Sequence, residues 1–236
     1  MTLPLGPIRN SHLFSNHWLE HRLPLEPEWD ELRAEAERVL DRLAGLWRAQ
    51  RDIVAQYGDE QGLEHAFIQP VLEALDWHLK YQTFLRGRKP DYALFLDDAA
   101  LRQAVKAGRT SQDFWKYPIV LADAKAWDRS LDRPLMVKRR RRYQREYPPE
   151  QIESYLQHSQ LGYAILTNGR FWRLIPRTLA PEQPRFETYL ECDISTILDY
   201  WAGMGPGADG KGLLDRPHVL DDFVRFYLFF SPAAWG

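Results

Sequence analysis

The spacing of hydrophobic positions changes near residue 90, from a helical period to short apolar runs. From about Glu28 to Gln56, apolar residues recur at intervals of three and four, which predicts an amphipathic helix. A second helix is predicted over Asp59–Leu75, where Pro70 predicts a kink or an early break. Residues 1–27 show no clear period, so we expect an irregular arm packed on the body.

Beyond residue 90 the short apolar runs predict buried strands. The runs are Tyr92–Leu96, Tyr117–Ala122 and Tyr163–Thr167, and Arg185–Glu191 is compatible with a further strand. Asn168-Gly169 favours a type I′ turn, so residues 162–176 are predicted to form a β-hairpin. Helices are predicted over 149–160, 194–202 and 218–230, with a Gly-rich loop over 203–212. Strands mixed with helices imply an α/β fold, with helices flanking a mixed central sheet.

Length and composition place the chain among ordinary globular proteins. Its 236 residues suffice for one domain with a real core, and 44% hydrophobic with 27% charged residues argues against disorder. Apolar runs stay far below the ~20 residues of a membrane span, so we expect no integral membrane protein. The N-terminus lacks the pattern of a secretory signal. The single cysteine, Cys192, excludes a disulfide framework and suits a cytoplasmic location.

The distribution of charge is more informative than its total. Residues 129–145 carry a net charge of +7, whereas the formal charge of the whole chain is −2. A basic patch on an acidic body is typical of a polyanion-binding surface, although a solvated loop would give the same pattern. The basic residues are Arg129, Arg133, Lys138, Arg139, Arg140, Arg141, Arg142 and Arg145.

Two short motifs carry the candidate chemistry. Pro90-Asp91 begins one predicted strand and Asp123-Ala124-Lys125 ends another. Adjacent strands would bring the two aspartates together at one edge of a sheet, and alternation places Asp123 and Lys125 on the same face. Carboxylate oxygens suit Mg²⁺, and a neighbouring ammonium can orient or deprotonate an attacking water. Each motif alone is weak, since D-x-K tripeptides and Pro-Asp turns are common.

Further polar residues accompany these motifs. Glu64 lies on the second predicted helix. Gln151 and Tyr155 are four residues apart on a later helix, so their side chains share one face and one groove.

The ordered set of motifs resembles the PD-(D/E)xK nuclease superfamily. More narrowly, it is similar to the N-terminal endonuclease domain of fused restriction–modification enzymes of type IIG and to the related nuclease domain of type I motor subunits. The motifs that carry the resemblance are Glu64, Pro90-Asp91, Asp123-Ala124-Lys125 and Gln151-x-x-x-Tyr155. The segments His12–Pro24, Leu166–Leu174 and Phe226–Trp235 resemble flanking parts of the same family, so the likeness covers nearly the whole chain.

The resemblance implies a restriction-endonuclease-like fold with three parts. Residues 1–57 would form an N-terminal arm and long helix packed on the nuclease core. Residues 58–203 would form the core itself, and residues 204–236 a linker and the start of a C-terminal helical connector. Methyltransferase and target-recognition parts would lie in a longer chain or complex.

The resemblance also implies Mg²⁺-dependent cleavage of double-stranded DNA, with Mn²⁺ as a substitute ion. Asp91 and Asp123 would hold the metal, Glu64 would be an outer or second ligand, and Lys125 would assist the nucleophilic water. Gln151 and Tyr155 would position the DNA backbone. Asp123 stands where glutamate is commoner in the family, and the long basic insert has no assigned family role; our hypothesis is phosphate contact by Lys138, Arg139, Arg140, Arg141 and Arg142.

The sequence leaves two other classes of function open. The chain could be a catalytically inactive DNA-binding or interaction module that retains the nuclease fold, or a structural adaptor in a phage-defence assembly. The distinguishing observation is whether Asp91, Asp123 and Lys125 meet within metal-coordinating reach.

Overall fold

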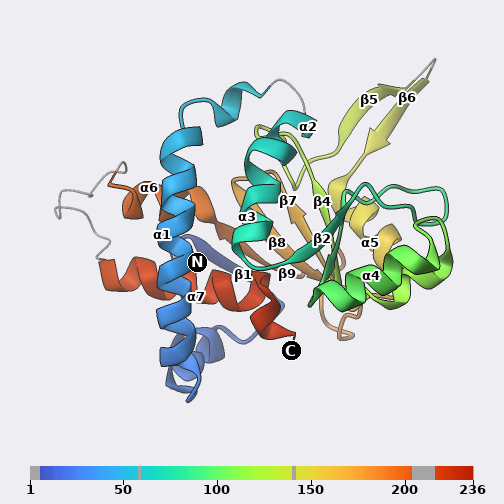
Figure 1. Cartoon of the computed structure of the whole chain (residues 1–236). Coiled ribbons are helices and arrows are strands. Elements are labelled where there is room, and N and C mark those ends of the chain that lie inside the picture. Colours follow the sequence, from blue (N-terminus) through green and yellow to red (C-terminus); the bar gives the residue numbers. More distant parts are fainter. Residues whose placement is uncertain (1–5, 58–59, 140–141, 204–215, 236) are drawn as a thin grey trace.

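A mixed sheet of seven strands forms the centre of the molecule, in the order β1-β9-β8-β7-β4-β3-β2 (Figure 1). The computed structural model describes residues 6–57, 60–139, 142–203 and 216–235. The pair β4–β7 is parallel and the other pairs of this sheet are antiparallel. The predicted α/β class, with a mixed sheet flanked by helices, is therefore confirmed.

The strands are β1 (Ile8–Ser11), β2 (His78–Tyr81), β3 (Tyr92–Phe95), β4 (Val120–Ala124), β5 (Leu135–Arg139), β6 (Arg142–Glu146), β7 (Tyr163–Thr167), β8 (Phe171–Pro176) and β9 (Tyr189–Asp193). The α-helices are α1 (Trp29–Gln50), α2 (Glu60–Leu63), α3 (Gln69–Ala74), α4 (Asp98–Ala107), α5 (Pro148–Ser159), α6 (Ile194–Trp201) and α7 (Arg216–Phe230). Short π-helical turns cover Trp18–Arg22 and Glu64–Ile68, and 3₁₀ turns cover Leu23–Leu25, Val54–Gln56, Gln112–Lys116 and Pro232–Ala234.

Helices cover both faces of the sheet. One buried cluster joins the sheet to α1, α3, α6 and α7, and a second joins its other face to α4 and α5. Successive residues of β3 alternate between the clusters: Leu94 belongs to the first and Ala93 to the second. This alternation is expected for a strand buried on both faces, and it explains why the run from Tyr92 is apolar without interruption.

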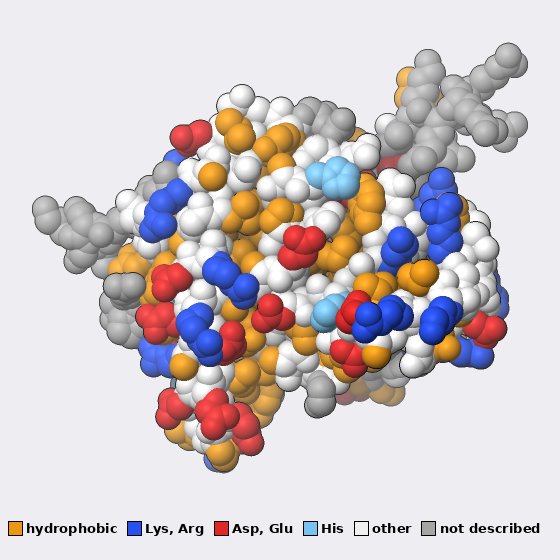
Figure 2. All heavy atoms as spheres, viewed as in Figure 1, with side chains coloured by type: hydrophobic (Ala, Val, Ile, Leu, Met, Phe, Trp, Pro, Cys, Tyr) orange, Lys and Arg blue, Asp and Glu red, His pale blue; other side chains and the backbone are white. Residues whose placement is uncertain are grey.

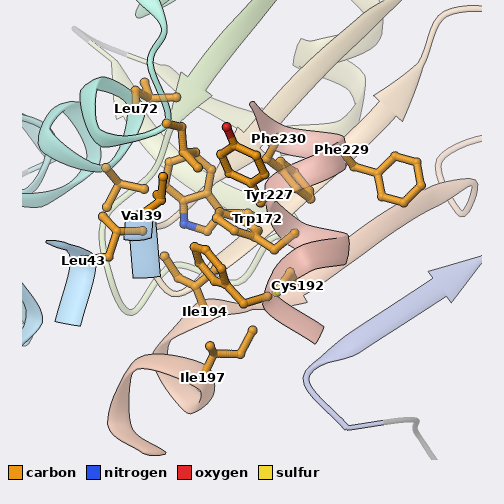
Figure 3. Packing of buried hydrophobic residues seen from close by; sticks show 14 of the residues in the cluster. Val39, Leu43, Leu72, Trp172, Cys192, Ile194, Ile197, Tyr227, Phe229 and Phe230 are labelled. Carbon is orange, nitrogen blue, oxygen red and sulfur yellow. The ribbon is translucent and has the colours of Figure 1, made fainter. Parts of the chain in front are cut away.

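The first cluster is centred on Trp172 of β8 (Figure 3). Its indole is fully buried and lies edge-on to the rings of Phe226 and Phe230. The indole Nε1 donates to the carbonyl of Gly169 at 3.0 Å. Helix α7 is thus packed into the same core as the sheet and α1, and its aromatic residues close that core.

The N-terminal arm was predicted to be irregular, but it contains β1 at the edge of the sheet. Ile8 lies opposite Cys192 of β9 in an antiparallel register. The strand is short and partly exposed, so its sequence Ile-Arg-Asn-Ser carries no alternation that would have revealed it.

The hairpin predicted over 162–176 is present, but its turn differs from the predicted type I′. Among the described residues at this turn only Gly169 has a positive φ, of 83°. Asn168 instead uses its side chain, whose Oδ1 accepts from the backbone N–H of Phe171 at 2.8 Å. Its Nδ2 donates to the carbonyls of Trp127 and Arg129, so Asn168 joins the turn to the loop that follows β4.

The predicted second helix is not one regular α-helix, because its geometry changes just before Pro70. A π-helical turn over Glu64–Ile68 leads into α3, and Pro70 occupies the first turn of α3. In that position the missing N–H of proline removes no hydrogen bond within α3. The helical path therefore continues to Ala74.

Two strand boundaries differ from the prediction. The strand predicted over 117–122 runs over Val120–Ala124, which places Asp123 inside it, and the strand considered over 185–191 begins at Tyr189. Most of the predicted Gly-rich loop lies outside the described residues. Within the described ranges, no helix has both the length and the hydrophobicity needed to cross a membrane.

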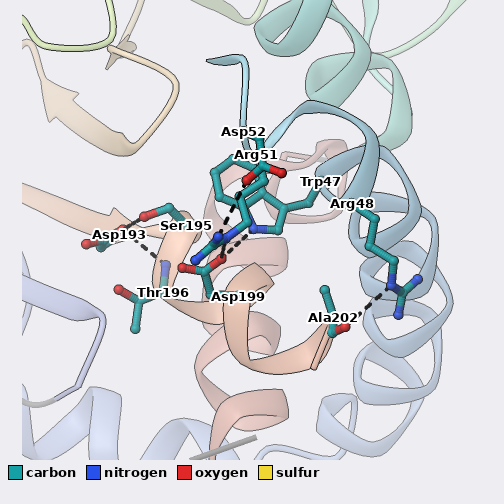
Figure 4. A network of polar contacts seen from close by, with 9 residues as sticks. All are labelled: Trp47, Arg48, Arg51, Asp52, Asp193, Ser195, Thr196, Asp199 and Ala202. Carbon is teal, nitrogen blue, oxygen red and sulfur yellow. Dashed lines mark hydrogen bonds and ion pairs between the residues drawn. The ribbon is translucent and has the colours of Figure 1, made fainter. Parts of the chain in front are cut away.

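A polar network fixes α1 against α6 (Figure 4). The Oδ1 atom of Asp199 accepts from Trp47 Nε1 at 2.8 Å and from Arg51 Nε at 2.5 Å. Replacing Asp199 by Ala is expected to lower the free energy of unfolding by about 1–2 kcal/mol, because both donors lose their acceptor. Denaturant unfolding measures this change. Asp52→Ala, at an exposed neighbouring carboxylate, is the matched control and should have little effect.

Candidate functional site

The two aspartates of the sequence motifs meet at the junction of β3 and β4. The strands are antiparallel, with Tyr92 opposite Ala122, so Asp91 at the start of β3 lies beside the end of β4. The Oδ2 atom of Asp91 accepts from the backbone N–H of Ala124 at 2.8 Å. The expected convergence of the two motifs at one edge is therefore present.

Lys125 and Asp123 form a buried ion pair on the same face of β4. The two residues are 9% and 1% exposed, so neither charge is compensated by bulk water. The Nζ atom of Lys125 contacts the Asp123 carboxylate and donates to the Ala124 carbonyl at 2.6 Å. The backbone N–H of Lys125 donates to Thr167 of β7 at 2.8 Å, which fixes the lysine at the centre of the sheet.

Three other carboxylates form a compact group beside this pair. Glu60, Glu64 and Asp91 each offer an oxygen within 4.8 Å of the others. Glu64 is only 4% exposed, and its Oε2 atom is buried without a hydrogen-bond partner. Such an orphaned carboxylate oxygen is costly in a protein interior unless a proton or a cation compensates it.

The pKa values of this acidic group rise for two physical reasons. Burial, together with the charges of Glu60 and Asp123, raises the pKa of Glu64 to about 7, although a hydrogen bond with Tyr81 opposes the rise. Burial, followed by repulsion from Asp123 and Glu64, holds the pKa of Asp91 well above its usual range. Burial also raises the pKa of Glu60, whose carboxylate accepts the N–H of Ala126. The positive charge near these carboxylates is therefore too small to offset the effects of burial and of their mutual repulsion.

The same carboxylates favour the charged form of Lys125. Burial lowers the pKa of Lys125, but the carboxylates of Asp123, Glu60 and Asp91 outweigh burial and raise it above the ordinary value. Lys125 is therefore an ammonium donor in this arrangement rather than a base.

Gln151 and Tyr155 share one face of α5, as predicted from their spacing. The Nε2 atom of Gln151 donates to the Tyr155 hydroxyl at 2.6 Å. Burial is the largest cause that raises the pKa of Tyr155, and the charge of Asp123 is the next. The side chains of Tyr155 and Asp123 are also hydrogen-bonded. Tyr155 thus brings α5 to the Asp123–Lys125 pair.

The loop after Lys125 is tightly packed against the β7–β8 turn. A Cβ added at Gly169 would lie 3.1 Å from the indole of Trp127, so a side chain there would push that ring away. The Trp127 ring stacks on Trp47 of α1 with centroids 5.9 Å apart. The segment that leaves the site is therefore held on both sides.

The basic residues predicted to contact phosphates fall on a separate element. Lys138 and Arg139 lie on β5 and Arg142 begins β6, whereas Arg140 and Arg141 lie outside the described residues. Among the described residues, the basic insert therefore forms a two-stranded β-ribbon, β5–β6, rather than a loop. Whether it contacts phosphates stays a prediction.

Sequence reasoning missed two members of the site. Glu60 precedes Glu64 by one helical turn, so the i, i+4 spacing could have placed both on one face. Tyr81, the hydrogen-bond partner of Glu64, lies on β2, whose partly exposed sequence gives no strand signal. Asp123, predicted as a metal ligand, pairs with Lys125, and Glu60 is the third member of the compact acidic group.

Comparison with known proteins adds nothing to this geometry. No family model, curated protein or solved structure matches the chain significantly.

Proposed function

We propose that the chain is a Mg²⁺-dependent endonuclease domain of the PD-(D/E)xK type, with a restriction-endonuclease-like core, which hydrolyses phosphodiester bonds of double-stranded DNA. The observation that carries the proposal is the convergence of Asp91, Asp123 and Lys125 at the junction of β3 and β4. This ordered set on adjacent strands is much more specific than any of its tripeptides alone.

The acidic group fits a hard divalent cation. It consists of carboxylate oxygens alone, the donor type that Mg²⁺ prefers, and Glu64 offers a buried oxygen with no other partner. Asp91 and Glu64 would hold the ion with Glu60, and Asp123 stands next to them as a further carboxylate. Mn²⁺ makes the same use of oxygen ligands and is expected to substitute.

When bound, the ion would lower the pKa of a coordinated water and stabilise negative charge on the phosphoryl group. Lys125 supplies an ammonium whose position is fixed by Asp123 and Ala124. A fixed ammonium orients the attacking water and stabilises the charge that develops in the transition state. Tyr155, which accepts a hydrogen bond from Gln151 and lies beside Asp123, would orient the DNA backbone.

The charge of the surface is consistent with a DNA partner on one side of the molecule. Figure 2 shows acidic side chains gathered over the start of α1, whereas Lys and Arg gather on the opposite side over α4. Exposed Arg102 and Lys106 of α4 belong to that basic side. The strongly basic segment 129–145 begins directly after the site. A basic surface next to a hydrolytic site is what binding of a polyanion requires.

The wider setting is part of the same proposal. In a cytoplasmic restriction–modification or phage-defence system, this domain would supply cleavage. Methyltransferase and target-recognition parts, in a longer chain or a complex, would supply specificity.

Plasmid cleavage tests the proposal. Wild-type protein with Mg²⁺ is expected to nick or linearise supercoiled plasmid, and EDTA is expected to stop the reaction. Lys125→Ala should slow cleavage by about 10²-fold, the usual effect of losing one fixed donor to the transition state. Arg38→Ala, which removes an exposed cation from α1, is the matched control and should cleave at the wild-type rate.

Binding measured in parallel separates catalysis from affinity. Lys125→Ala should bind duplex DNA within a few-fold of wild type. If the wild type binds DNA but cleaves no faster than Lys125→Ala, the hydrolytic assignment is wrong and the inactive binding module replaces it.

A further inference from the structure

The β5–β6 ribbon is a structural element separate from the central sheet. Its two strands pair only with each other among the described residues, and Figure 1 shows the ribbon projecting from the body. Leu135, Met136 and Tyr143 are 48%, 59% and 66% exposed. An isolated two-stranded ribbon is marginally stable in water, so exposed apolar side chains on such a ribbon point to a partner.

The base of the ribbon is nevertheless firmly fixed. The Nη2 atom of Arg129 donates to the carbonyl of Glu146, the last residue of β6, at 3.2 Å. Asp132, just before β5, accepts from Arg173 at 2.9 Å. Arg173 is itself buried on the sheet and paired with Glu191. The base of the ribbon is therefore bonded to the central sheet through Asp132 and Arg173.

One face of the ribbon combines apolar and basic positions without an acid. Met136 lies opposite Arg145 and Lys138 lies opposite Tyr143, and these four positions share a face by strand alternation. Met136 and Tyr143 are diagonal neighbours in this register, so their exposed side chains are close enough to form one patch. The other face carries Glu146 at the base of the ribbon.

The base of this ribbon is also linked by hydrogen bonds to the strand ends around Lys125. The carbonyl of Arg129, beside this base, accepts from Asn168 Nδ2 at 3.0 Å, and the carbonyl of the preceding residue Thr167 accepts from the backbone N–H of Lys125 at 2.8 Å. A polymer held by the ribbon would therefore pass close to the candidate active site.

We propose that the β5–β6 ribbon is a DNA-binding arm that enters the major groove next to the cleavage site. Its Met136–Tyr143 face would contact base edges, and the flanking cations would contact phosphates. This inference rests on the proposed nuclease function and adds the groove and the contacting face. A net charge of +7 over residues 129–145 matches a polyanion.

The dimensions of the ribbon select duplex DNA. Five residues per strand, at roughly 3.4 Å each, give a reach of about 17 Å. The major groove of B-DNA is about 12 Å wide and 8.5 Å deep and admits a two-stranded ribbon. The major groove of double-stranded RNA is too narrow for side chains to read, so RNA should compete poorly.

Photocrosslinking to duplex DNA that carries 5-iodouracil in place of thymine tests the arm, because the iodine atom lies in the major groove. The full chain with Lys125→Ala is used with Mg²⁺, so that the DNA survives. Ultraviolet light is expected to cross-link the peptide that contains Tyr143. Adding Tyr143→Leu should lower the cross-linked fraction at least tenfold at saturating DNA, whereas Tyr117→Leu, at a partly exposed tyrosine outside the ribbon, should leave it unchanged.

Salt dependence provides a second readout that does not use Tyr143. Arg145→Ala is expected to reduce the slope of log Kd against log salt by about 0.9, the value of one phosphate contact. Arg38→Ala should leave the slope unchanged. Both exposed-site variants should melt at the temperature of the parent chain.

The outcomes separate this inference from the proposed function. Mg²⁺-dependent cleavage by the wild type, combined with equal cross-linking before and after Tyr143→Leu, would overturn the arm and leave the nuclease. Equal competition by duplex RNA would also overturn it. Absence of any DNA binding by the wild type would overturn both proposals.

Discussion

Replacing Trp172 by Ala is expected to lower the free energy of unfolding by about 3–5 kcal/mol, the usual cost of truncating a fully buried aromatic side chain. Trp172 is 0% exposed and fills the space between the sheet and α7. The substitution leaves a cavity beside Phe226 and Phe230 and removes the donor that binds the Gly169 carbonyl. For a chain of this size the melting temperature should fall by about 10 °C.

Thermal and denaturant unfolding measure this effect. Trp172→Phe keeps an aromatic ring and loses only part of the volume, so it should lose clearly less stability than Trp172→Ala. Equal losses would mean that the cost comes from the Nε1 hydrogen bond rather than from packing. A loss below about 1 kcal/mol for Trp172→Ala would contradict the central place given to this residue in the core.

The parts of the fold that the sequence predicted are those whose period is set by burial. Helix α1 presents one apolar stripe to the core, and strands β3, β7 and β8 are buried on both faces. In these elements the positions of hydrophobic residues follow directly from which side chains are buried. The two strands of the central sheet that the sequence did not predict, β1 and β2, lie at its edges, where half-exposed residues show no clear hydrophobic pattern.

The convergence of Asp91 and Asp123 was predictable because it requires only that their two strands be neighbours in the sheet. Asp91 and Asp123 belong to strands that follow one another in the sequence, and an antiparallel pairing of such strands brings their motifs together. Glu60 was not predicted, although its position one helical turn before Glu64 places both residues on the same helix face. Tyr81 reaches Glu64 from strand β2, whereas Glu64 lies on a helical turn, so this contact depends on tertiary structure that no local pattern encodes.

The turn at Asn168 shows why a correct element can have a wrong detail. The Asn-Gly pair predicted a hairpin, and the hairpin formed, but the Asn168 side chain is occupied by the loop after Lys125. A tertiary contact therefore selected the backbone geometry of the turn. The same contact helps to position the segment between the site and the ribbon.

The acidic group makes the stability of the metal-free protein fall with rising pH. The pKa of Glu64 is about 7 in the folded state, against 4.5 for an unperturbed glutamate, so the folded state holds this proton more tightly than the unfolded state. The stabilisation from this proton is complete below about pH 4.5 and is lost as the pH rises through about 7. The shift corresponds to about 3 kcal/mol. The raised pKa of Asp91 acts in the same direction.

Glu64→Gln should therefore raise the free energy of unfolding of the metal-free protein at pH 8 by up to about 3 kcal/mol, and flatten its decline between pH 5 and pH 8. A glutamine carbonyl can still accept the hydrogen bond of Tyr81. Mg²⁺ should raise the melting temperature of the wild type at pH 8, because it compensates the same charges, and the variant should lose most of this response. Glu73→Gln, at an exposed carboxylate of α3, should behave as the wild type in both measurements. If Glu64→Gln keeps the pH profile and the Mg²⁺ response of the wild type, the Glu64 carboxylate neither holds the proton that titrates near pH 7 nor binds the ion. In that case Glu64 would be a buried carboxyl group without a role in metal binding, and the metal site would have to be sought around Asp123.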